Sequence, residues 1–517
     1  MNPFVKAGAV VGAAAAAGLC AAVIAAGSPA PAPSYSTGDV ASANPRWAVE
    51  DNVLASDLRE TPAAWGNLAL SNPDTTLGVT HYGYDTSNGG PLTQDPHEAF
   101  KTEPDKNVYL VMGGHHYLFQ GHEGGPHGYV TRIDLDQTDL AQRVTLVSDS
   151  DNLGGNLPNF DGITWDPFSH QLLLSFEAKA PNGGIWAITL DDNGNATTGH
   201  GVRLPALGQG GYEGVQNDSA GNVWLVEDIG GAGVNGGKKP NSYVYRFVPT
   251  DKTDLTLGGT LQALQVKRYD GTPITAAQLQ ADPTSSVITK LHTYGRTYDT
   301  QWVTAHTGVE PFDSTASAAA ASATPFKRPE NGVFRPGTGF KQFYFTETGD
   351  TSALSTLPGA YGGVFRIVQT SPSAMTGKLQ PVMIGNQEHT GLDNIAFAGR
   401  NELLVVEDAG DSLHAQRNAL DSGYLLKLSP DVAVATRIST KRWLAEGRDA
   451  SAVYDATTSP GYNDGDNEIT GIHVSDGDPS IAGILGAKIP LPFGGTWRVF
   501  WTQQHGENVT WEVTRAH

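Results

Sequence analysis

Apolar and polar residues alternate in short runs over most of the chain from Tyr109 to the C-terminus, as at 222–226 and 242–247. A period of two is typical of β-strands that bury one face. Helical periodicity is confined to short segments around 276–281 and 411–420. The pattern therefore predicts an all-β fold.

A unit of three strands recurs along the chain. In each copy an acidic residue at a turn precedes the first strand, a hairpin leads to a second strand that ends in Glu or Asp, and a third strand follows. Such repeats with variable insertions are typical of propeller blades. Copies begin near residues 160, 212, 329, 392 and 468, and the segment 109–147 can supply another. We expect a six-bladed β-propeller with loop insertions; a β-sandwich is the alternative.

The N-terminus has the pattern of an export signal. Lys6 precedes an apolar run over 7–26, and a small, proline-rich stretch follows at 27–33. We expect residues 1–34 to be a signal peptide and proline-rich linker, and residues 35–517 to form a single β-propeller domain. The protein would then be secreted, periplasmic or at the cell surface. An uncleaved anchor is the alternative, since about 20 apolar residues can span a bilayer.

The composition excludes several partners. The chain carries 54 Asp and Glu against 33 Lys and Arg, a formal charge of −21. This surplus of carboxylates repels nucleic acid and anionic lipid, and it suits divalent cations. We expect no nucleic-acid partner, no stable membrane partner after cleavage, and a monomer. The single cysteine, Cys20, excludes an intramolecular disulfide and a thiolate zinc site.

The acidic residue at the head of each repeat carries the candidate chemistry. One such residue alone would be an ordinary turn former. Equivalent positions of propeller blades, however, converge on the central channel. Carboxylates at these positions would repel one another there. A bound Ca²⁺ ion, which takes several oxygen ligands, would neutralise their charge. The sequence predicts a metal site formed by Asp161, Glu213, Glu330, Asp393 and Glu468. The histidines at 115, 116, 122 and 127 we interpret as exposed or hydrogen-bonded.

Several stretches are long enough to be specific, including 119–125, 161–168 and 211–218, together with Arg328-Pro329-Glu330-Asn331 and Leu392-Asp393-Asn394. They resemble the PhoX-type alkaline phosphatases and their relatives, from about residue 113 to the C-terminus. The resemblance implies a secreted six-bladed propeller. Its axial channel would hold calcium together with iron and hydrolyse phosphate monoesters.

The resemblance also assigns roles to residues. By motif, Glu213, Glu330 and Asp393 match metal-binding carboxylates, Glu177 matches a calcium ligand, and Arg328 matches a phosphate contact. Arg328 and Glu330 are thus the expected catalytic residues. Arginine suits this role because its planar fork of donors matches phosphate oxygens.

One position departs from the family pattern. Members with the iron centre place a cysteine thiolate just before the glutamate matched by Glu177, and this chain has Phe176 there. Either oxygen ligands alone hold the metals, or the site is catalytically silent. Calcium is thus the expected metal, and the iron that the resemblance also implies lacks its bridging thiolate.

Two functional hypotheses follow. In the first, the protein is a metal-dependent phosphatase that acts on a small phosphorylated substrate at carboxylate-bound calcium, with or without iron. In the second, the same acidic ring binds calcium that stabilises a non-catalytic propeller, whose channel binds a ligand or partner. A lactonase-like or phytase-like calcium propeller is a third possibility.

Overall fold

The computed structural model describes residues 34–46, 51–86, 100–428, 439–447, 468–505 and 508–516. The expected signal peptide, within residues 1–33, lies outside the described residues. From Ser34 onward the chain forms one compact unit. In the described part, no helix combines the length and apolar character that a membrane crossing requires.

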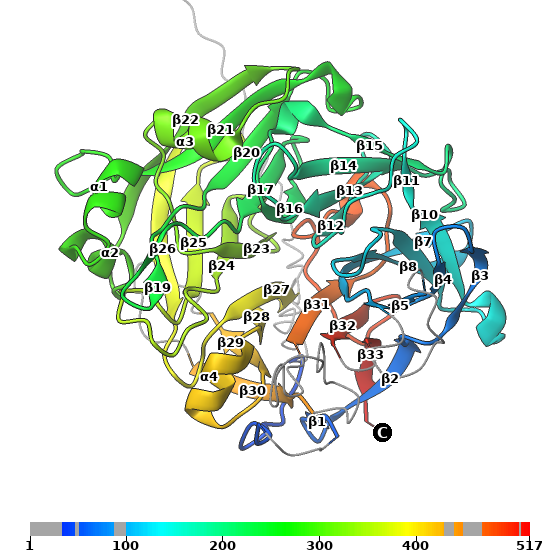
Figure 1. The fold of residues 1–517 in the computed structure, drawn as a ribbon. Coiled ribbons are helices and arrows are strands. Elements are labelled where there is room, and N and C mark those ends of the chain that lie inside the picture. The colour runs from blue at the N-terminus through cyan, green and yellow to red at the C-terminus, as the bar shows by residue number, and fades with distance from the viewer. Residues whose placement is uncertain are drawn as a thin grey trace, which may run out of the picture. The chain divides into compact units, whose positions relative to one another are not determined.

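Six strands form a ring around the centre of this unit (Figure 1). Each contacts the next in chain order, and the last contacts the first, so the ring closes. These innermost strands are β7 (Pro104–Met112), β12 (Ile163–Asp166), β16 (Tyr212–Asn217), β23 (Pro329–Phe334), β27 (Leu392–Gly399) and β31 (Glu468–Ser475). A β-sandwich has no such ring.

Further strands extend each innermost strand outward in antiparallel order. The second strands are β8 (His115–His122), β13 (Gln171–Phe176), β17 (Val223–Glu227), β24 (Gln342–Glu347), β28 (Glu402–Glu407) and β32 (Arg498–Gln504). The third strands are β9 (Val130–Asp134), β14 (Gly184–Thr189), β20 (Val244–Pro249), β25 (Gly363–Gln369), β29 (Ser422–Lys427) and β33 (Val509–Arg515). The fourth strands are β10 (Val144–Ser148), β15 (His200–Arg203), β21 (Gly259–Val266), β26 (Thr376–Ile384), β30 (Ser439–Ala445) and β2 (Leu58–Ala64).

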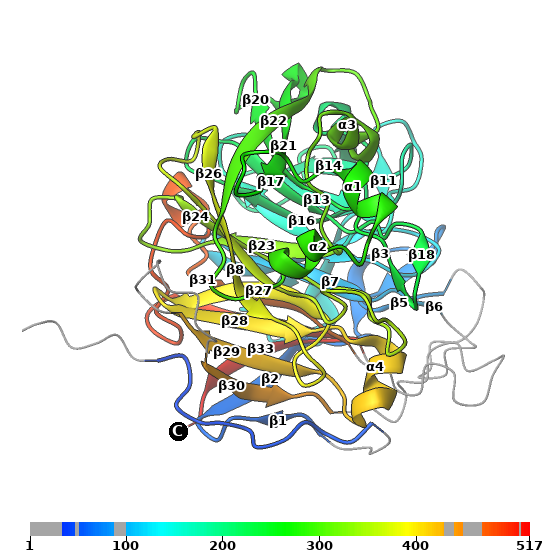
Figure 2. The ribbon, with the colours of Figure 1, turned by 90° about the vertical axis from the view of Figure 1, so that its left-hand side faces the viewer.

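The chain closes its own ring, because β2 from the N-terminal part pairs antiparallel with the C-terminal β33 (Figures 1 and 2). Peripheral strands then join neighbouring sheets. The long β22 pairs with both β21 and β26, and this pairing joins two sheets into a single nine-stranded sheet. The peripheral strands are β1 (Val53–Leu54), β3 (Ala69–Asp74), β4 (Val79–His81), β5 (Tyr84–Asp85), β6 (Phe100–Lys101), β11 (Ser150–Asp151), β18 (Gly233–Val234), β19 (Gly237–Lys238) and β22 (Tyr298–Gly308).

Within the described ranges the helices are short and lie between strands (Figure 1). They are α1 (Ala276–Ala281), α2 (Ser286–Leu291), α3 (Ser314–Ala320), α4 (Gly410–Arg417) and four 3-10 turns at Leu140–Gln142, Pro205–Leu207, Leu255–Leu257 and Ile481–Gly483. The expected all-β propeller class is confirmed. The expected number of blades, six, equals the number of strands in the ring. The blade count stays a prediction, because peripheral strands join neighbouring sheets.

The hydrophobic core lies between neighbouring sheets. Leu173 of β13 packs in one cluster with Leu225 of β17 and Tyr245 of β20. Leu404 of β28 packs with Trp501 of β32 in another. Each fully buried side chain of this kind contributes about 1.5–3 kcal/mol. Packing across sheets therefore keeps the innermost strands at fixed positions around the axis.

Buried glutamates at the ends of three second strands tie strands to one another. Glu227, Glu347 and Glu407 are fully buried. Backbone N–H groups donate to them, from Tyr243 to Glu227 (3.1 Å), from Lys327 to Glu347 (2.9 Å) and from Thr390 to Glu407 (2.9 Å). Because each bond reaches the start of another strand, these carboxylates fix where the inner ends of the strands lie.

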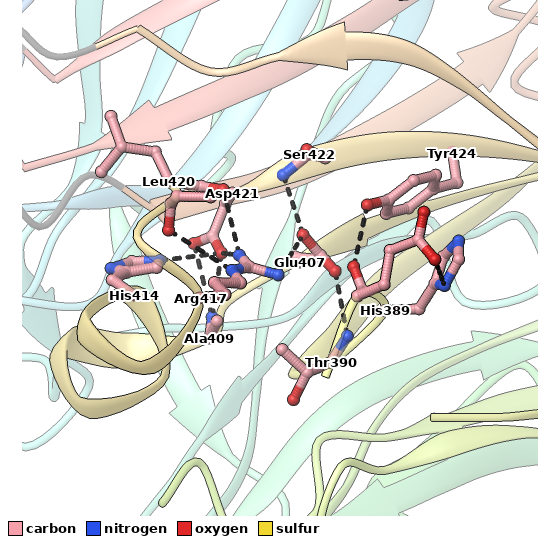
Figure 3. Close-up of polar contacts among 12 residues, drawn as sticks. His389, Thr390, Glu407, Ala409, His414, Arg417, Leu420, Asp421, Ser422 and Tyr424 are labelled. Atoms are coloured by element: carbon pink, nitrogen blue, oxygen red, sulfur yellow. Dashed lines mark hydrogen bonds and ion pairs between the residues drawn. The ribbon is translucent and has the colours of Figure 1, made fainter. Parts of the chain in front are cut away.

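Around Glu407 the contacts extend into an ion-pair network with α4 (Figure 3). Arg417 contacts Glu407 Oε2 at 3.1 Å and Asp421 Oδ1 at 2.7 Å, and the Ser422 N–H donates to Glu407 Oε2 at 3.0 Å. His414 Nε2 lies 2.9 Å from Asp421 Oδ1. Burial raises the pKa of Glu407 to about 7, although the Arg417 charge opposes this rise. Arg417 therefore compensates two carboxylates that have left water.

Replacing Arg417 with Met should destabilise the fold. The substitution leaves Glu407 and Asp421 buried without their cation, and breaking a buried pair in this way costs about 3–5 kcal/mol. Urea unfolding at saturating calcium measures the loss. Lys427→Met is the control, because Lys427 is half exposed and 3.9 Å from Glu402, and it should cost about 1 kcal/mol or less. Equal losses in the two variants would contradict the role of Arg417.

Candidate metal centre

A carboxylate stands at or beside the head of every innermost strand. Glu213, Glu330 and Asp393 are second residues of β16, β23 and β27, Glu468 begins β31, and Asp161 precedes β12 by two residues. The structure thus places the predicted residues at equivalent positions of the ring. Sequence analysis missed the sixth, Asp105, the second residue of β7. Apart from Glu468, which is partly buried, these residues are buried.

The strand backbone is irregular where these carboxylates lie. Four innermost strands shift register across the carboxylate, between Pro104 and Asn107, Tyr212 and Val215, Pro329 and Gly332, and Leu392 and Ile395. In β31 the shift comes two residues beyond Glu468, between Thr470 and His473. A bulge bends a strand and redirects its side chains. The repeated irregularity explains how side chains at the head of an inner strand turn toward the axis.

Two glycines allow neighbouring backbones to approach at this level. A Cβ at Gly162 would lie 2.1 Å from the carbonyl oxygen of Glu213. A Cβ at Gly214 would lie 2.9 Å from the carbonyl oxygen of Glu330. Glycine at these positions therefore lets adjacent innermost strands bring their carboxylates close together.

The carboxylates form two groups among the described residues. One oxygen from each of Glu213, Glu330 and Asp393 lies within 4.8 Å of the others. Asp105, Glu123 and Asp161 form a second such group. The first joins three residues predicted from sequence, and the second combines predicted Asp161 with two that were missed.

Residues that directly follow second strands add further charges. Glu123 follows β8 and accepts a hydrogen bond from Gln504 Nε2 at 3.0 Å. The predicted Glu177 follows β13, and its backbone N–H donates to Asp161 Oδ2 at 2.8 Å. Asp228 follows β17 and is buried. Glu177 therefore lies beside the second group, outside both triads.

Burial and mutual repulsion raise the pKa values of these carboxyl groups. Burial raises the pKa of Glu213 well above its ordinary value, and the charges of Asp161 and Glu330 raise it further. Burial, opposed by an Asn394 hydrogen bond and the Lys106 charge, brings the pKa of Asp393 to about 7. Without a cation the ring therefore holds protons that a bound metal ion would displace.

The donor set fits a hard divalent cation. Both triads consist of carboxylate oxygens, which Ca²⁺ prefers. Cys20 lies outside the described residues. At position 176, which the resemblance matches to a bridging thiolate, the Phe176 ring packs on Trp186 with centroids 6.1 Å apart, in an apolar cluster. That position does not supply a ligand, so calcium fits the donor set better than a thiolate-bridged iron centre.

Arg328 lies directly beside the first triad. Its Nε donates to both carboxylate oxygens of Asp228 at 2.8 Å, and its Nη2 lies 3.7 Å from Glu330 Oε1. Nη1 donates to Thr351 Oγ1 at 3.2 Å. Burial alone would lower the pKa of the Arg328 guanidinium, but Asp228 and Glu330 raise it overall. The side chain keeps 17% exposure.

Lys106 is a second cation of the site, also missed by sequence analysis. It is buried, and its Nζ donates to Asn331 Oδ1. Burial lowers its pKa to about 8, against the opposing effect of Asp105, Asp393 and Glu213. The alternation of apolar and polar residues from Tyr109 predicts a strand, and extending that strand by three residues toward the N-terminus would have included Lys106.

The segment between β31 and β32 packs across the other ends of the innermost strands. Its contacts are Gly477 with Val111, the Pro479 carbonyl with Trp165 Nε1 (2.7 Å), and Gly486 with Phe334. Ile484 of this segment belongs to the same apolar cluster as Trp224. The carboxylates lie at the opposite ends of these strands, where Glu177 is exposed and Arg328 is partly exposed.

The histidines near residue 115 do not converge. His122 is buried and bonds Thr131 Oγ1 at 2.9 Å, whereas His116 Nδ1 contacts Asp136 at 2.9 Å near the surface. His127 Nδ1 lies 2.9 Å from Asn156 Nδ2. Their interpretation as exposed or hydrogen-bonded residues agrees with these contacts. Exposed His115 lies near two aspartates that could hold a metal ion.

Residues 188–485 match the family model described as "Alkaline phosphatase PhoX". No curated protein gives a significant match. A solved structure of Pseudomonas fluorescens PhoX in complex with vanadate, a transition state analogue, is 12% identical, covers 92% of this chain and 98% of its own, and has a TM-score of 0.54. This likeness shows the same fold.

Two further solved structures are more distant. The periplasmic gluconolactonase PpgL of Pseudomonas aeruginosa is 9% identical, with 89% of this chain and 99% of that chain covered and a TM-score of 0.36. The GH43_1 enzyme from Xanthomonas citri complexed with xylotriose is 12% identical, with 65% and 90% covered and a TM-score of 0.33. These scores are too low to support an argument about this chain.

Removing divalent cations should reverse the pH dependence of stability. In the metal-free protein the raised pKa of Asp393 means that the native state binds more protons, so stability falls as pH rises from 3.8, the ordinary value, to about 7. With calcium, stability should rise with pH over the same window, because the cation binds the deprotonated ring. At pH 8, EDTA should lower Tm by about 5 °C or more.

Thermal unfolding monitored by circular dichroism measures both profiles. Asp393→Asn is the matched variant, because it removes one titrating group and leaves an amide of the same size. Its metal-free profile should be flatter than that of the unchanged chain. Superimposable profiles with and without calcium would contradict cation binding at the ring.

Proposed function

Because the chain belongs to the PhoX alkaline phosphatase family, as its match over residues 188–485 shows, we propose that it hydrolyses small phosphate monoesters at the carboxylate ring. Family membership makes it a phosphoric monoester hydrolase that depends on metal. The position of the site and the choice of calcium belong to the proposal. So do secretion or a periplasmic location, and action as a monomer without nucleic-acid or membrane partners.

The observation that carries the proposal is the convergence of three carboxylates from separate strands. Glu213, Glu330 and Asp393 come from β16, β23 and β27 and bring oxygens within 4.8 Å of one another. These residues would hold one cation, and Asp105, Glu123 and Asp161 would hold another, with Glu177 alongside. Bound there, divalent cations would withdraw charge from phosphate oxygens and neutralise charge that develops on them.

Arg328 supplies oriented donors at the edge of this site. Asp228 holds the guanidinium through Nε and Nη2, the latter at 2.6 Å. The Nη1 group donates one N–H to Thr351 at 3.2 Å, and its second N–H can donate to a phosphate oxygen. A planar fork fixed in this way binds equatorial oxygens as negative charge spreads over them. Asp228 is thus a positioning residue for Arg328.

Glu330 links the arginine to the carboxylate triad. Its Oε1 lies 3.7 Å from Arg328 Nη2, and Thr348 Oγ1 donates to the same oxygen. A carboxylate between guanidinium and cation holds both at a constant separation. Glu330 would therefore keep the Arg328 guanidinium and the cation, both of which would contact phosphate, at a fixed distance from each other. This role supports its expected catalytic importance.

A non-catalytic propeller stabilised by calcium is the second candidate. The observation that favours it is the lack of a thiolate at position 176, where Phe176 packs on Trp186. Oxygen ligands can nevertheless hold divalent cations without sulfur. Family membership favours the enzyme, with metal ions held by carboxylates.

Phosphatase activity should depend strictly on divalent cations and on Glu330. Purified protein should hydrolyse p-nitrophenyl phosphate with calcium present and lose turnover in EDTA. Glu330→Gln should lower kcat by about 100-fold or more, because it removes charge from the triad and the fixed contact to Arg328. Glu388→Gln, with a 67% exposed side chain, is the control and should match the unchanged chain. Full turnover in chelator would refute the mechanism.

Arg328→Lys should separate phosphate binding from metal binding. Lysine keeps the charge but loses the planar fork, so kcat/KM should fall by about 10- to 100-fold, or about 1.4–2.7 kcal/mol. Metal content, measured by elemental analysis, should stay constant. Arg59→Lys is the matched control, because Arg59 is an exposed residue of β2. Unchanged kcat/KM in Arg328→Lys would exclude a phosphate contact by this residue.

A further inference from the structure

The backbone of Arg328 has an unfavourable conformation. Its φ is +59°, in the left-handed region that a residue with a Cβ rarely adopts. Such a conformation persists where the surrounding structure holds it, and it is concentrated at functional sites. The contacts that hold residues 327–330 therefore decide where the Arg328 guanidinium lies.

The end of β24 holds this backbone. Glu347 Oε1 accepts a hydrogen bond from the Lys327 N–H at 2.9 Å. The Thr348 N–H donates to the Arg328 carbonyl at 2.9 Å, and the Gly349 N–H donates to the Lys327 carbonyl at 3.2 Å. The peptide groups on both sides of Arg328 are thus bonded to residues 347–349.

A histidine from the insertion between β21 and β22 holds Glu347 in turn. His292 directly follows α2, and its Nε2 lies 2.7 Å from Glu347 Oε2. Its Nδ1 lies 2.9 Å from the carbonyl oxygen of Ile288. A carbonyl oxygen only accepts, so Nδ1 carries a proton. Burial alone would lower the pKa of His292, but the Glu347 charge and hydrogen bond raise it overall. The contact is therefore an ion pair that uses both ring nitrogens as donors.

The surroundings leave the His292 ring little freedom. The side chain is 5% exposed, and that of Glu347 is fully buried. Phe365 meets the ring edge to face, with centroids 5.6 Å apart. A Cβ at Gly359 would lie 2.5 Å from His292 Nε2. Because Ile288 and Leu291 of α2 pack in the same apolar cluster as Phe365, the insertion presents His292 to Glu347 at a fixed position.

We propose that His292 and Glu347 are positioning residues for Arg328, through which the α2 insertion sets the backbone that carries the guanidinium. The inference rests on the proposed function, which makes Arg328 a phosphate contact. Glu347, the ion-pair partner of His292, belongs to neither carboxylate triad. Loss of the pair should therefore weaken phosphate binding through Arg328 and leave the metal ligands in place.

His292→Asn and His292→Gln form a matched pair that tests this role. Asparagine places an amide N–H where Nδ1 lies and can still bond Ile288, whereas glutamine places one where Nε2 lies and can still bond Glu347. With calcium, His292→Asn should lower kcat/KM for p-nitrophenyl phosphate by about 10-fold. His292→Gln should lower it by about threefold or less. Calcium content should be the same in both variants. Equal losses of kcat/KM in the two variants would contradict the role of the Glu347 contact.

A double variant shows whether His292 acts through Arg328. If it does, His292→Asn/Arg328→Lys should have a kcat/KM within about threefold of Arg328→Lys alone. His414→Asn is the control, because His414 is also buried and its Nε2 lies 2.9 Å from a carboxylate, that of Asp421. Its effect, whatever its size, should multiply with that of Arg328→Lys. Effects of His292→Asn and Arg328→Lys that multiply in the same way would overturn the proposal.

Amide hydrogen exchange followed by mass spectrometry needs no substrate. The peptide that contains residues 327–331 should exchange about fivefold faster or more in His292→Asn, because the Lys327 N–H loses its ordered acceptor, and at an unchanged rate in His292→Gln. If His292→Asn does not fold, Gly359→Ala replaces it in all measurements, since the added Cβ displaces the ring from Glu347. An unchanged exchange rate would overturn the proposal. Faster exchange in a protein whose unchanged chain has no phosphatase turnover contradicts the proposed function alone.

Discussion

Repulsion among carboxylates gathered at one axis is the constraint on which the rest of the structure depends. Burial and neighbouring charges raise the pKa of Glu213, Asp161 and Asp105 alike. The fold opposes this repulsion at the periphery, through β2–β33 pairing and through apolar packing between sheets. A cation at the axis would bind the carboxylates where their mutual repulsion is strongest, and it would link strands that are far apart in sequence.

The repeat delivers one carboxylate per innermost strand through backbone geometry. A bulge redirects the head of the strand, and glycines such as Gly162 and Gly214 let the next strand approach. Buried glutamates such as Glu407 then fix the neighbouring strand ends. The order of the ring is therefore set by main-chain contacts, and the carboxylates need no attractive contacts with each other.

Much of this could be predicted from sequence because it repeats. Glu213, Glu330 and Asp393 follow from their recurrence beside Gly or Asn at strand heads. Asp105 and Lys106 were missed because β7 begins before the alternating pattern becomes evident. The pair Glu227-Asp228 shows a second limit of prediction from sequence. The sequence indicates that the strand ends in acidic residues. It does not indicate that Glu227 accepts a backbone hydrogen bond from Tyr243 whereas Asp228 pairs with Arg328. Such choices depend on contacts with residues far away in the chain.

The electrostatics of Arg328 explain why metal dependence belongs to this geometry. Its guanidinium lies 2.6 Å from Asp228 and 3.7 Å from Glu330, so it contributes directed donors but little net positive charge. The chain as a whole carries −21 and repels a phosphate dianion. In the proposed mechanism, the attraction that brings phosphate to Arg328 would therefore come from bound cations, whose charge would exceed what the neighbouring carboxylates cancel.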